Sequence, residues 1–253
     1  MNRMKRQIEL FLTAVMFYTR IPVPRSLGFS EDRLNRSTRY FTVIGWLVGG
    51  WGAAVFYGLH FLFPVGLAVF LSMLATILLT GAFHEDGFAD FCDGFGGGCT
   101  REGILGIMKD SRIGTYGTLG LIGILGSKFL SVQALPPVLI PRALLAAHAF
   151  SRMIPVLLIF TSRYSREDAL SKTKPVGRRG KLSDLLVAAV AGFLPLLLFP
   201  WQLTVLLIPF SLLLSWMFKH YTEQKIGGYT GDCLGALQQL TEIFFYLCLL
   251  TLG

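Results

Sequence analysis

Four carboxylates lie close together in the stretch 84–98, which reads HEDGFADFCDGFGGG. If this stretch is helical, Asp86, Asp90 and Asp93 project from one face, because they are spaced by four and then three residues, and Glu85 lies on the flank. Like charges placed in this way repel one another, and a bound divalent cation would convert that repulsion into attraction. Oxygen donors favour Mg²⁺ or Mn²⁺ over zinc. The pattern therefore predicts a metal site at these four side chains, and the three aspartates are also candidate catalytic residues.

Glycines follow the carboxylates directly. Gly94, and then Gly96, Gly97 and Gly98, are expected to end the helix in a loop whose backbone amides can approach a phosphate closely. Gly96 and Gly97 are therefore candidate substrate-binding positions. A solvated acidic loop with a glycine turn is the alternative, but beside an apolar segment the clustered charge favours a metal site.

A second acidic stretch, 227–242, reads GGYTGDCLGALQQLTE. Its glycines predict a loop, in which Thr230 can cap the next helix and is a candidate substrate contact. Asp232 starts that helix and is a candidate catalytic residue, completing the metal site or acting as a base, although an N-cap role alone would also explain it. The helix then carries a small and polar stripe that should face the bundle interior: Asp232, Gly235, Ala236, Gln239 and Glu242.

Positive charge lies between the two acidic stretches. In KDSRIGTYG, residues 109–117, Lys109 and Arg112 come just before a predicted helix and could bind a diphosphate at its positive end. The basic stretch KTKPVGRRGK, residues 172–181, could do the same. For both stretches the alternative is an ordinary role in setting membrane orientation.

An arginine and a glutamate fall near the middle of two apolar segments. Arg152 shares a helix face with His148, and Glu242 lies at a similar depth in the last segment. Because an unpaired charge inside a bilayer is unfavourable, we expect Arg152 and Glu242 to pair. The pair is either structural or in contact with substrate, so both residues are candidate substrate-binding residues. Lys128 and Arg142 are expected near the far side, where long side chains can reach the membrane surface.

The composition is that of a polytopic membrane protein. Of the 253 residues, 53% are hydrophobic and only 15% are charged, and the mean hydropathy is +0.59. We expect an all-α, polytopic transmembrane helix bundle that forms one integral membrane domain over 1–253, with an amphipathic or re-entrant helix at 4–20. The apolar segments predict about seven spans: 40–63, 65–83, 113–135, 141–161, 185–199, 203–218 and 233–252.

Basic residues predict the orientation of this bundle. Of the 23 Lys and Arg residues, all but Lys128, Arg142 and Arg152 lie in the N-terminal segment 1–39 or in the longer connections. By the positive-inside rule these segments face the cytoplasm. The net charge of +8 reflects the same bias, and no basic patch with interleaved aromatics indicates nucleic-acid binding. The longer connections are an acidic catalytic loop at 84–112, a basic loop at 162–184 and a glycine-rich loop at 219–232.

Several other chemistries lack their sequence motifs. The 4 cysteines form no paired CxxC pattern, so that neither a zinc centre nor a disulfide framework is expected. The chain also has no P-loop, no dinucleotide fingerprint and no Ser-His-Asp spacing.

Four stretches resemble signature sequences of the cobalamin synthase family, the adenosylcobinamide-GDP ribazoletransferases. They are HEDGFADFCDGFGGG, KDSRIGTYG, AHAFSRMIPV and GGYTGDCLGALQQLTE. The opening FLTAVMFYTRIPVP and the segment RYFTVIGWLVGG are also similar, although Thr42 stands where many members have proline. The resemblance therefore extends over almost the whole chain.

This resemblance implies a Mg²⁺-dependent enzyme of the bacterial cytoplasmic (inner) membrane that acts in the last steps of cobalamin biosynthesis. Adenosylcobinamide-GDP and α-ribazole, or its 5′-phosphate, would give adenosylcobalamin, or its 5′-phosphate, and GMP. A ribazole hydroxyl would attack the phosphate joined to the corrinoid side arm. Such phosphoryl transfer depends mainly on positioning and charge neutralisation, which carboxylate-bound metal and nearby Lys or Arg side chains supply.

Two other classes remain open at this point. The DxxDG at 90–94 is part of the longer motif of CDP-alcohol phosphatidyltransferases, although the rest of that motif is missing. Intramembrane Arg152 and Glu242 would suit a membrane transporter, but the acidic residues gather at one face and not at the midplane. The sequence leaves the oligomeric state open, and a homo-oligomer is compatible with it.

Overall fold

The structure is a computed structural model that describes residues 3–28, 30–165 and 180–252. The regular secondary structure of these residues is helical, as predicted, apart from one β-bridge between Tyr164 and Tyr229. The α-helices, in chain order, are α1 Arg3–Tyr18, α2 Glu31–Ser37, α3 Phe41–His60, α4 Val65–Thr80, α5 Phe83–Gly97, α6 Arg101–Ile107, α7 Thr115–Gln133, α8 Ile140–Ser151, α9 Met153–Thr161, α10 Leu182–Phe193, α11 Trp201–Ile226 and α12 Gly231–Leu250. Three short 3-10 helices accompany them: η1 Arg25–Leu27, η2 Thr38–Tyr40 and η3 Leu194–Leu198.

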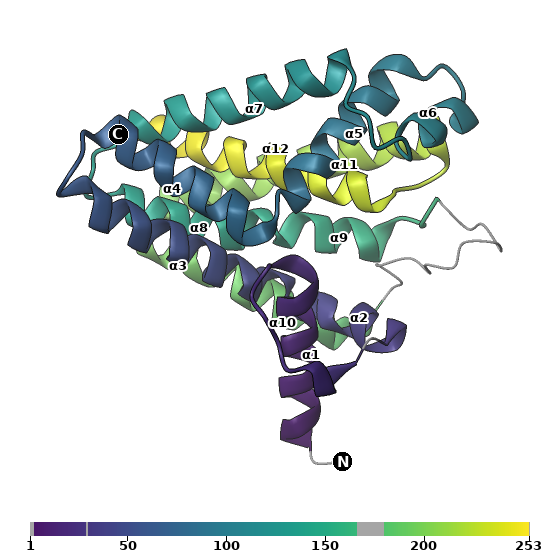
Figure 1. Cartoon of the computed structure of the whole chain (residues 1–253), viewed down its shortest axis with the longest axis horizontal. Helices are drawn as coiled ribbons and strands as arrows, with labels where there is room; N and C mark the ends of the chain where they lie inside the picture. Colours follow the sequence, from purple (N-terminus) through teal and green to yellow (C-terminus); the bar gives the residue numbers. More distant parts are fainter. Residues whose placement is uncertain (1–2, 29, 166–179, 253) are drawn as a thin grey trace.

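Helix α1 corresponds to the helix predicted at 4–20. It runs at a steep angle to the long axis of the bundle and projects from its side (Figure 1). The side chains of Arg39 and Tyr40 both donate hydrogen bonds to Gln7 Oε1, at 3.2 and 2.8 Å, and fix α1 against the start of α3. A helix that crosses the bundle axis in this way suits a position in the membrane surface.

Four continuous helical segments among the described residues are long and apolar enough to cross a membrane: Glu31–His60, Ile140–Thr161, Trp201–Ile226 and Gly231–Leu250. Helices α4 and α5 would form a fifth span only as a bent pair, because their axes differ by 88°. Helix α10 is short, and Pro195 continues it as the 3-10 helix η3. The structure thus has four or five candidate spans, and the count of seven remains a prediction.

The bend between α4 and α5 separates apolar from acidic sequence. Gly81 and Ala82 both have left-handed backbone conformations, with φ of 67° and 58°. Gly81 ends α4 in the manner of a C-cap, where a residue without a side chain adopts this conformation most readily. Helix α5 therefore starts at Phe83 in a new direction, and its first turn carries Glu85 and Asp86.

The centre of the bundle is formed by α8, α9 and α12. The span Ile140–Thr161 is 83% buried and Gly231–Leu250 is 72% buried, whereas Trp201–Ile226, which is 28% buried, lies at the periphery. Helix α3 packs backbone to backbone on α8. A Cβ atom added at Gly45 would lie 2.3 Å from the His148 carbonyl oxygen, and one at Gly49 would lie 2.6 Å from the Leu144 carbonyl oxygen. This Gly-xxx-Gly spacing is typical of close helix packing in membranes.

The central span is interrupted at Arg152, between α8 and α9. Pro155 has no N–H to pair with the carbonyl four residues earlier, and its ring collides with that carbonyl. The Arg152 backbone N–H instead bonds to Phe150 O, and the Arg152 side chain donates to the carbonyl oxygen of His148 at 2.7 Å. The proline thus creates a break in the helix, and the Arg152 side chain donates the hydrogen bond that the His148 carbonyl oxygen would otherwise lack.

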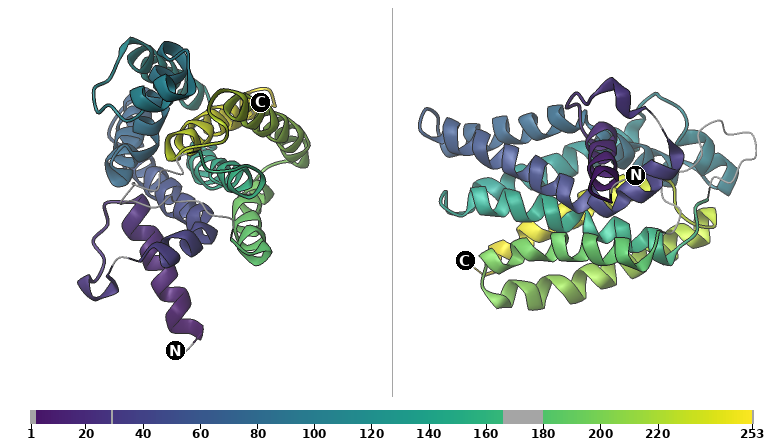
Figure 2. Two further views of the ribbon diagram at one scale, coloured as in Figure 1. Left: turned by 90° about the vertical axis from the view of Figure 1, so that its right-hand side faces the viewer. Right: turned by 90° about the horizontal axis from the view of Figure 1, so that it is seen from below.

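The connections that lead from α5 to α6 and from α11 to α12 lie at one end of the bundle, together with the first described residues after α9 (Figures 1 and 2). Arg101 joins two of them, because its Nε donates to Ile226 O at 3.0 Å and its Nη2 donates to Ser165 O at 2.9 Å. The connections were predicted to share one face, and their described parts do. Most of the basic stretch 172–181 lies outside the described residues.

Candidate active site

The two acidic stretches come together where α5 crosses the start of α12. A Cβ atom added at Gly87 would lie 3.1 Å from Asp232 Cα and 3.3 Å from the Asp232 carbonyl oxygen. One added at Gly235 would lie 3.2 Å from the His84 carbonyl oxygen. Glycine on both helices therefore permits backbone contact, and this contact brings the start of α12 beside the acidic face of α5.

Three carboxylates belong to residues at or next to this crossing in the chain. Asp86 is exposed, and Asp90, one turn later, is half-buried, as is Asp232. Thr230 is buried and caps α12, since its Oγ1 accepts from the Cys233 N–H at 3.3 Å. The Thr230 hydroxyl also lies 3.3 Å from Asp232 Oδ2, as donor, and so fixes that carboxylate at the helix start. The cap role expected for Thr230 is confirmed.

Asp93 has a different environment from the other aspartates of α5. Its Oδ2 accepts from the Gly114 N–H at 2.7 Å, and its Oδ1 accepts from the Gly117 N–H at 2.8 Å. Both oxygens therefore cap the N-terminus of α7, whose first amides have no partner within their own helix. The structure gives Asp93 a role that the sequence did not indicate.

The donor set at the crossing fits a hard divalent cation by its chemistry. Across residues 3–28, 30–165 and 180–252, no three His, Cys, Asp or Glu side chains are close enough to hold one metal ion by themselves. Protein sites for Mg²⁺ in phosphoryl transfer commonly contribute only one or two carboxylates, and substrate phosphates and water complete the shell. The exposed Asp86 and its neighbour Asp90 suit such a site.

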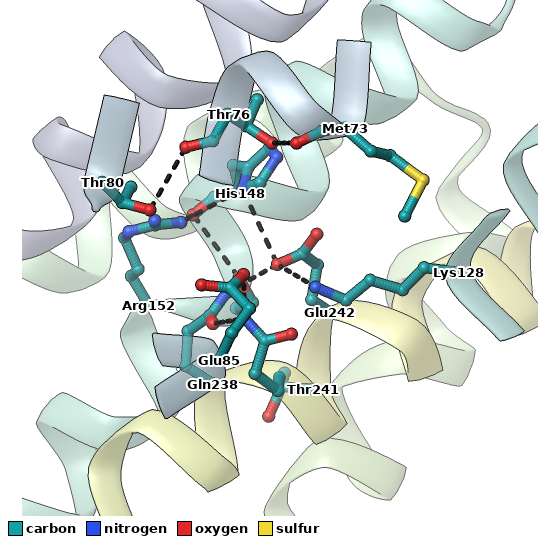
Figure 3. A network of polar contacts seen from close by, with 12 residues as sticks. Met73, Thr76, Thr80, Glu85, Lys128, His148, Arg152, Gln238, Thr241 and Glu242 are labelled. Carbon is teal, nitrogen blue, oxygen red and sulfur yellow. Dashed lines mark hydrogen bonds and ion pairs between the residues drawn. The ribbon is translucent and has the colours of Figure 1, made fainter. Parts of the chain in front are cut away.

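A buried polar network lies deeper in the bundle (Figure 3). Glu242 Oε2 is 3.0 Å from Lys128 Nζ, 2.7 Å from Gln238 Nε2 and 3.6 Å from His148 Nδ1. His148 Nδ1 also lies 3.3 Å from Arg152 Nη1. Lys128, Arg152 and Glu242 are at most 4% exposed, so that two positive charges and one negative charge lie together inside the protein, with Lys128 paired directly to Glu242.

This network corrects two expectations. Lys128 was expected to reach the far membrane surface, but it is buried and forms the ion pair with Glu242. Arg152 and Glu242 do lie in one network, yet His148 stands between them. The sequence signal for Lys128 was a single lysine within an otherwise uncharged helix, α7.

Glu85 connects the network to the acidic face of α5. Its Oε1 accepts from Gln239 Nε2 at 3.0 Å, and Gln239 Nε2 also donates to Gln238 Oε1 at 2.9 Å. Gln238 in turn donates to Glu242. Glu85 therefore turns toward the buried amides of α12.

A model of the cobalamin-5-phosphate synthase family matches residues 10–250 of the chain. The chain belongs to this family. Similar proteins named adenosylcobinamide-GDP ribazoletransferase include one from Shewanella amazonensis, 48% identical over 100% of this chain and 98% of its own length. One from Vibrio cholerae is 45% identical over 98% of this chain and 95% of its own length. One from Ralstonia pickettii is 46% identical over 96% of this chain and 95% of its own length. No solved structure matches.

The glycine run of this cobalamin-5-phosphate synthase family member is not the loop that its sequence predicts. Helix α5 continues through Gly94, Gly96 and Gly97 and ends there. Their amides lie within the helix, and the Tyr116 ring packs over Gly96, since a Cβ atom there would lie 2.6 Å from Tyr116 Cγ. The glycines allow close packing around α5, and a direct phosphate contact by Gly96 and Gly97 stays a prediction.

Lys109 and Arg112 lie in the connection that leads from α6 to α7. Both are exposed, and Arg112 forms an ion pair with Asp110, with Nη2 2.6 Å from Oδ2. Hydrogen bonds from Arg112 lower the pKa of Asp110 to about 2. The Gly114 contact with Asp93 holds this connection against α5. Both basic side chains therefore lie on the segment anchored at the acidic end.

Proposed function

We propose that this chain joins α-ribazole, or its 5′-phosphate, to adenosylcobinamide-GDP, with release of GMP and formation of adenosylcobalamin, or its 5′-phosphate. Its family membership and the names of its relatives support this function. The single observation that carries the location of the site is the close contact of α5 with α12 at Gly87 and Gly235. That contact assembles carboxylates from two distant stretches at one end of the bundle.

Asp86 and Asp90 hold Mg²⁺ in this proposal, together with the diphosphate of the substrate. When bound, Mg²⁺ neutralises charge on the diphosphate and on the departing GMP. Asp232, which lies at the same crossing, accepts the proton of the attacking hydroxyl. Glu85, whose Oε1 accepts from Gln239, and Asp93, whose two oxygens accept from Gly114 and Gly117, fix α5 in position.

The transfer itself balances without any further reactant. The ribazole oxygen forms a bond to the phosphorus attached to the corrinoid side arm, the bond between the two phosphates breaks, and GMP leaves. The proton of the ribazole hydroxyl passes to Asp232. Lys109 binds the diphosphate from the connection between α6 and α7, and Arg112 assists, although Asp110 offsets part of its charge.

The same proposal places the chain in the bacterial cytoplasmic membrane with the α6 end inside. The longer connections that meet at this end are rich in Lys and Arg, which remain on the cytoplasmic side of membranes. Nucleotides and Mg²⁺ are available there. Helices α7 and α10 would supply the spans missing from a total of about seven.

The direct test is GMP release by the purified full-length protein. We expect GMP to appear from adenosylcobinamide-GDP only when both α-ribazole and Mg²⁺ are present. An Asp86→Asn variant prepared identically controls for contaminating enzymes. Release without α-ribazole would indicate a hydrolase, and no release with all components present would contradict the proposed function.

A further inference from the structure

Helices α1, α2 and α10 enclose a basic cavity that plays no part in the proposed reaction. Its volume is about 320 Å³, and cationic side chains from α1, α2, η2 and the residue that precedes α10 line it. They are Arg6, Arg36, Arg39 and Lys181. Asp184 also lines the cavity, so that positive charge exceeds negative charge.

The cations of this cavity are held to different degrees. Arg39 is fixed, because it forms an ion pair with the buried Asp184 and donates to Gln7. Arg36 has an ion pair only to an aspartate that is 76% exposed, Asp32, and such exposed pairs are weak. The cavity is thus built on one fixed arginine and retains positive charge that an anionic group can use.

An apolar groove begins where the basic cavity ends. Val187 lines both, and from there the groove continues between α3 and α10 past Trp46, Val190 and Leu194, with a volume of about 610 Å³. Its α10 side chains are exposed, Val190 by 67%. The Trp46 indole N–H donates to Ala191 O at 2.7 Å, which fixes the ring at the groove. The charged cavity and the apolar surface groove are therefore neighbours that share Val187.

The length of the groove matches one leaflet of a bilayer. From Asp184 to Leu194, ten residues of helical rise span about 15 Å. The hydrocarbon core of a bilayer is about 30 Å thick, so half of it is also about 15 Å. Both α3 and α10 start at the basic end, where the positive-inside rule predicts the membrane surface.

We propose that this is a binding site for an anionic phospholipid. Its phosphate and anionic headgroup occupy the basic cavity, and one acyl chain lies along the groove between α3 and α10. Only an anionic lipid uses both parts of the site. A soluble phosphate would not need the groove, and a neutral lipid would not need the arginines.

The test is a lipid titration of the delipidated full-length protein in dodecyl maltoside, followed by native mass spectrometry and thermal unfolding. Phosphatidylglycerol should be retained with at least tenfold higher affinity than phosphatidylcholine and should raise the unfolding temperature more. Glycerol 1-phosphate, which has the headgroup phosphate and no acyl chain, should do neither. An equal effect of glycerol 1-phosphate would indicate a site for soluble phosphate, and equal retention of the two lipids would indicate unselective lipid contact; either result overturns the proposal.

Two variants probe the two halves separately. Arg6→Gln combined with Lys181→Gln should weaken phosphatidylglycerol binding at least tenfold and leave phosphatidylcholine unaffected. Its control is Arg25→Gln combined with Lys225→Gln, which removes the same charge from exposed positions outside the cavity. Unchanged binding in the Arg6 and Lys181 variant contradicts the proposal.

Val190→Trp should obstruct the groove and weaken binding of phosphatidylglycerol. Val205→Trp is its control, because Val205 is similarly exposed, at 59%, but lies on α11. If Val190→Trp and Val205→Trp bind phosphatidylglycerol equally well, the acyl chain does not occupy the groove.

Discussion

Helices α5 and α12 carry two sets of charged residues, one at the end of the bundle near α6 and one inside it. At the end, Asp86 is exposed and Asp90 and Asp232 are half-buried. Inside, Glu242 is 3% exposed and accepts from Lys128 and Gln238, while Glu85 accepts from Gln239. The two helices therefore combine carboxylates that reach solvent with a buried glutamate, Glu242, that is paired inside the bundle.

Substitutions in the two sets should have different consequences for the protein. In a buried network each charge depends on the other, and removal of one partner leaves an uncompensated charge in an apolar medium. At the accessible end, water can solvate what remains after a carboxylate is neutralised, so that the main loss is in the binding of an added cation or phosphate. Substitutions in the buried set should therefore mainly change stability, and substitutions in the accessible set should mainly change turnover.

The largest expected effect is on stability, in the buried set. Lys128→Met and Glu242→Gln should each lower the free energy of unfolding by about 3–5 kcal/mol, because each leaves its partner unpaired. The double variant should lose less than the sum. Unfolding in mixed micelles measures all three, and the exposed Arg142 supplies the control Arg142→Met, expected within about 0.5 kcal/mol of the unmodified protein.

A second cycle sharpens this result. Arg152→Met combined with Glu242→Gln should show a smaller coupling energy than the Lys128 cycle, because His148 separates Arg152 from Glu242. Equal coupling in the two cycles would show that Arg152 pairs directly with Glu242.

Next in size is the loss of turnover at the accessible set. Asp86→Asn and Asp90→Asn should each lower the rate of GMP release by about 10²–10³-fold, comparable to the loss of a group that stabilises transition-state charge. The unfolding midpoint of Asp86→Asn should barely change, because the Asp86 side chain is exposed. Glu102→Gln, an exposed carboxylate on the neighbouring α6, is the control and should retain full activity. A near-normal rate at limiting Mg²⁺ would remove the substituted residue from the metal site.

The helix crossing that assembles the accessible set can be disturbed without a change of charge. Gly235→Ala would place a Cβ atom 3.2 Å from the His84 carbonyl oxygen, and separating the backbones should cost about 1–3 kcal/mol and reduce turnover. Gly58→Ala is the matched control, since nothing lies within 4 Å of a Cβ atom there and alanine favours a helix. Equal activity of both variants would mean that the close contact of α5 and α12 is not required.

The smallest effect is expected at Asp93. Its spacing in the sequence puts it on the acidic face of α5, but both of its oxygens accept hydrogen bonds from α7 and its N-cap. Asp93→Ala should lower the free energy of unfolding by about 1–2 kcal/mol, because the amides of Gly114 and Gly117 lose their cap. Asp93→Asn, which keeps one acceptor oxygen, should retain part of the stability and most of the activity. Turnover as low as in Asp86→Asn would instead place Asp93 in the metal site.

Residue spacing predicted the elements of the site well. The helix carrying Asp86 and Asp90, the polar face of the last helix and the meeting of the longer connections at one end all follow from local periodicity and charge. These features depend on residues that are near one another in the chain, or on the membrane acting on all loops alike.

Features that depend on packing between helices could not be predicted. Lys128 was expected to reach the membrane surface because the sequence gives its position along α7. The sequence does not show that Lys128 lies against Glu242 of α12. The glycines after Asp93 were expected to end the helix in a loop. Helix α5 instead continues through Gly97, and these glycines allow close neighbours: a Cβ atom at Gly94 would lie 2.4 Å from Met108 Cγ. A glycine for flexibility and a glycine for contact look the same in a sequence.

The central claim, that the cation binds where α5 crosses the start of α12, can be tested by localised backbone cleavage. In the presence of adenosylcobinamide-GDP, Fe²⁺ replaces Mg²⁺. Ascorbate and peroxide then start radical cleavage of the backbone, and mass spectrometry identifies the new chain ends. Cleavage should fall near residues 86–90 and near residue 232, excess Mg²⁺ should suppress it, and Asp86→Asn should abolish it. Mg²⁺-sensitive cleavage near Lys128 and Glu242 in place of these positions would contradict the account and move the cation site into the buried network.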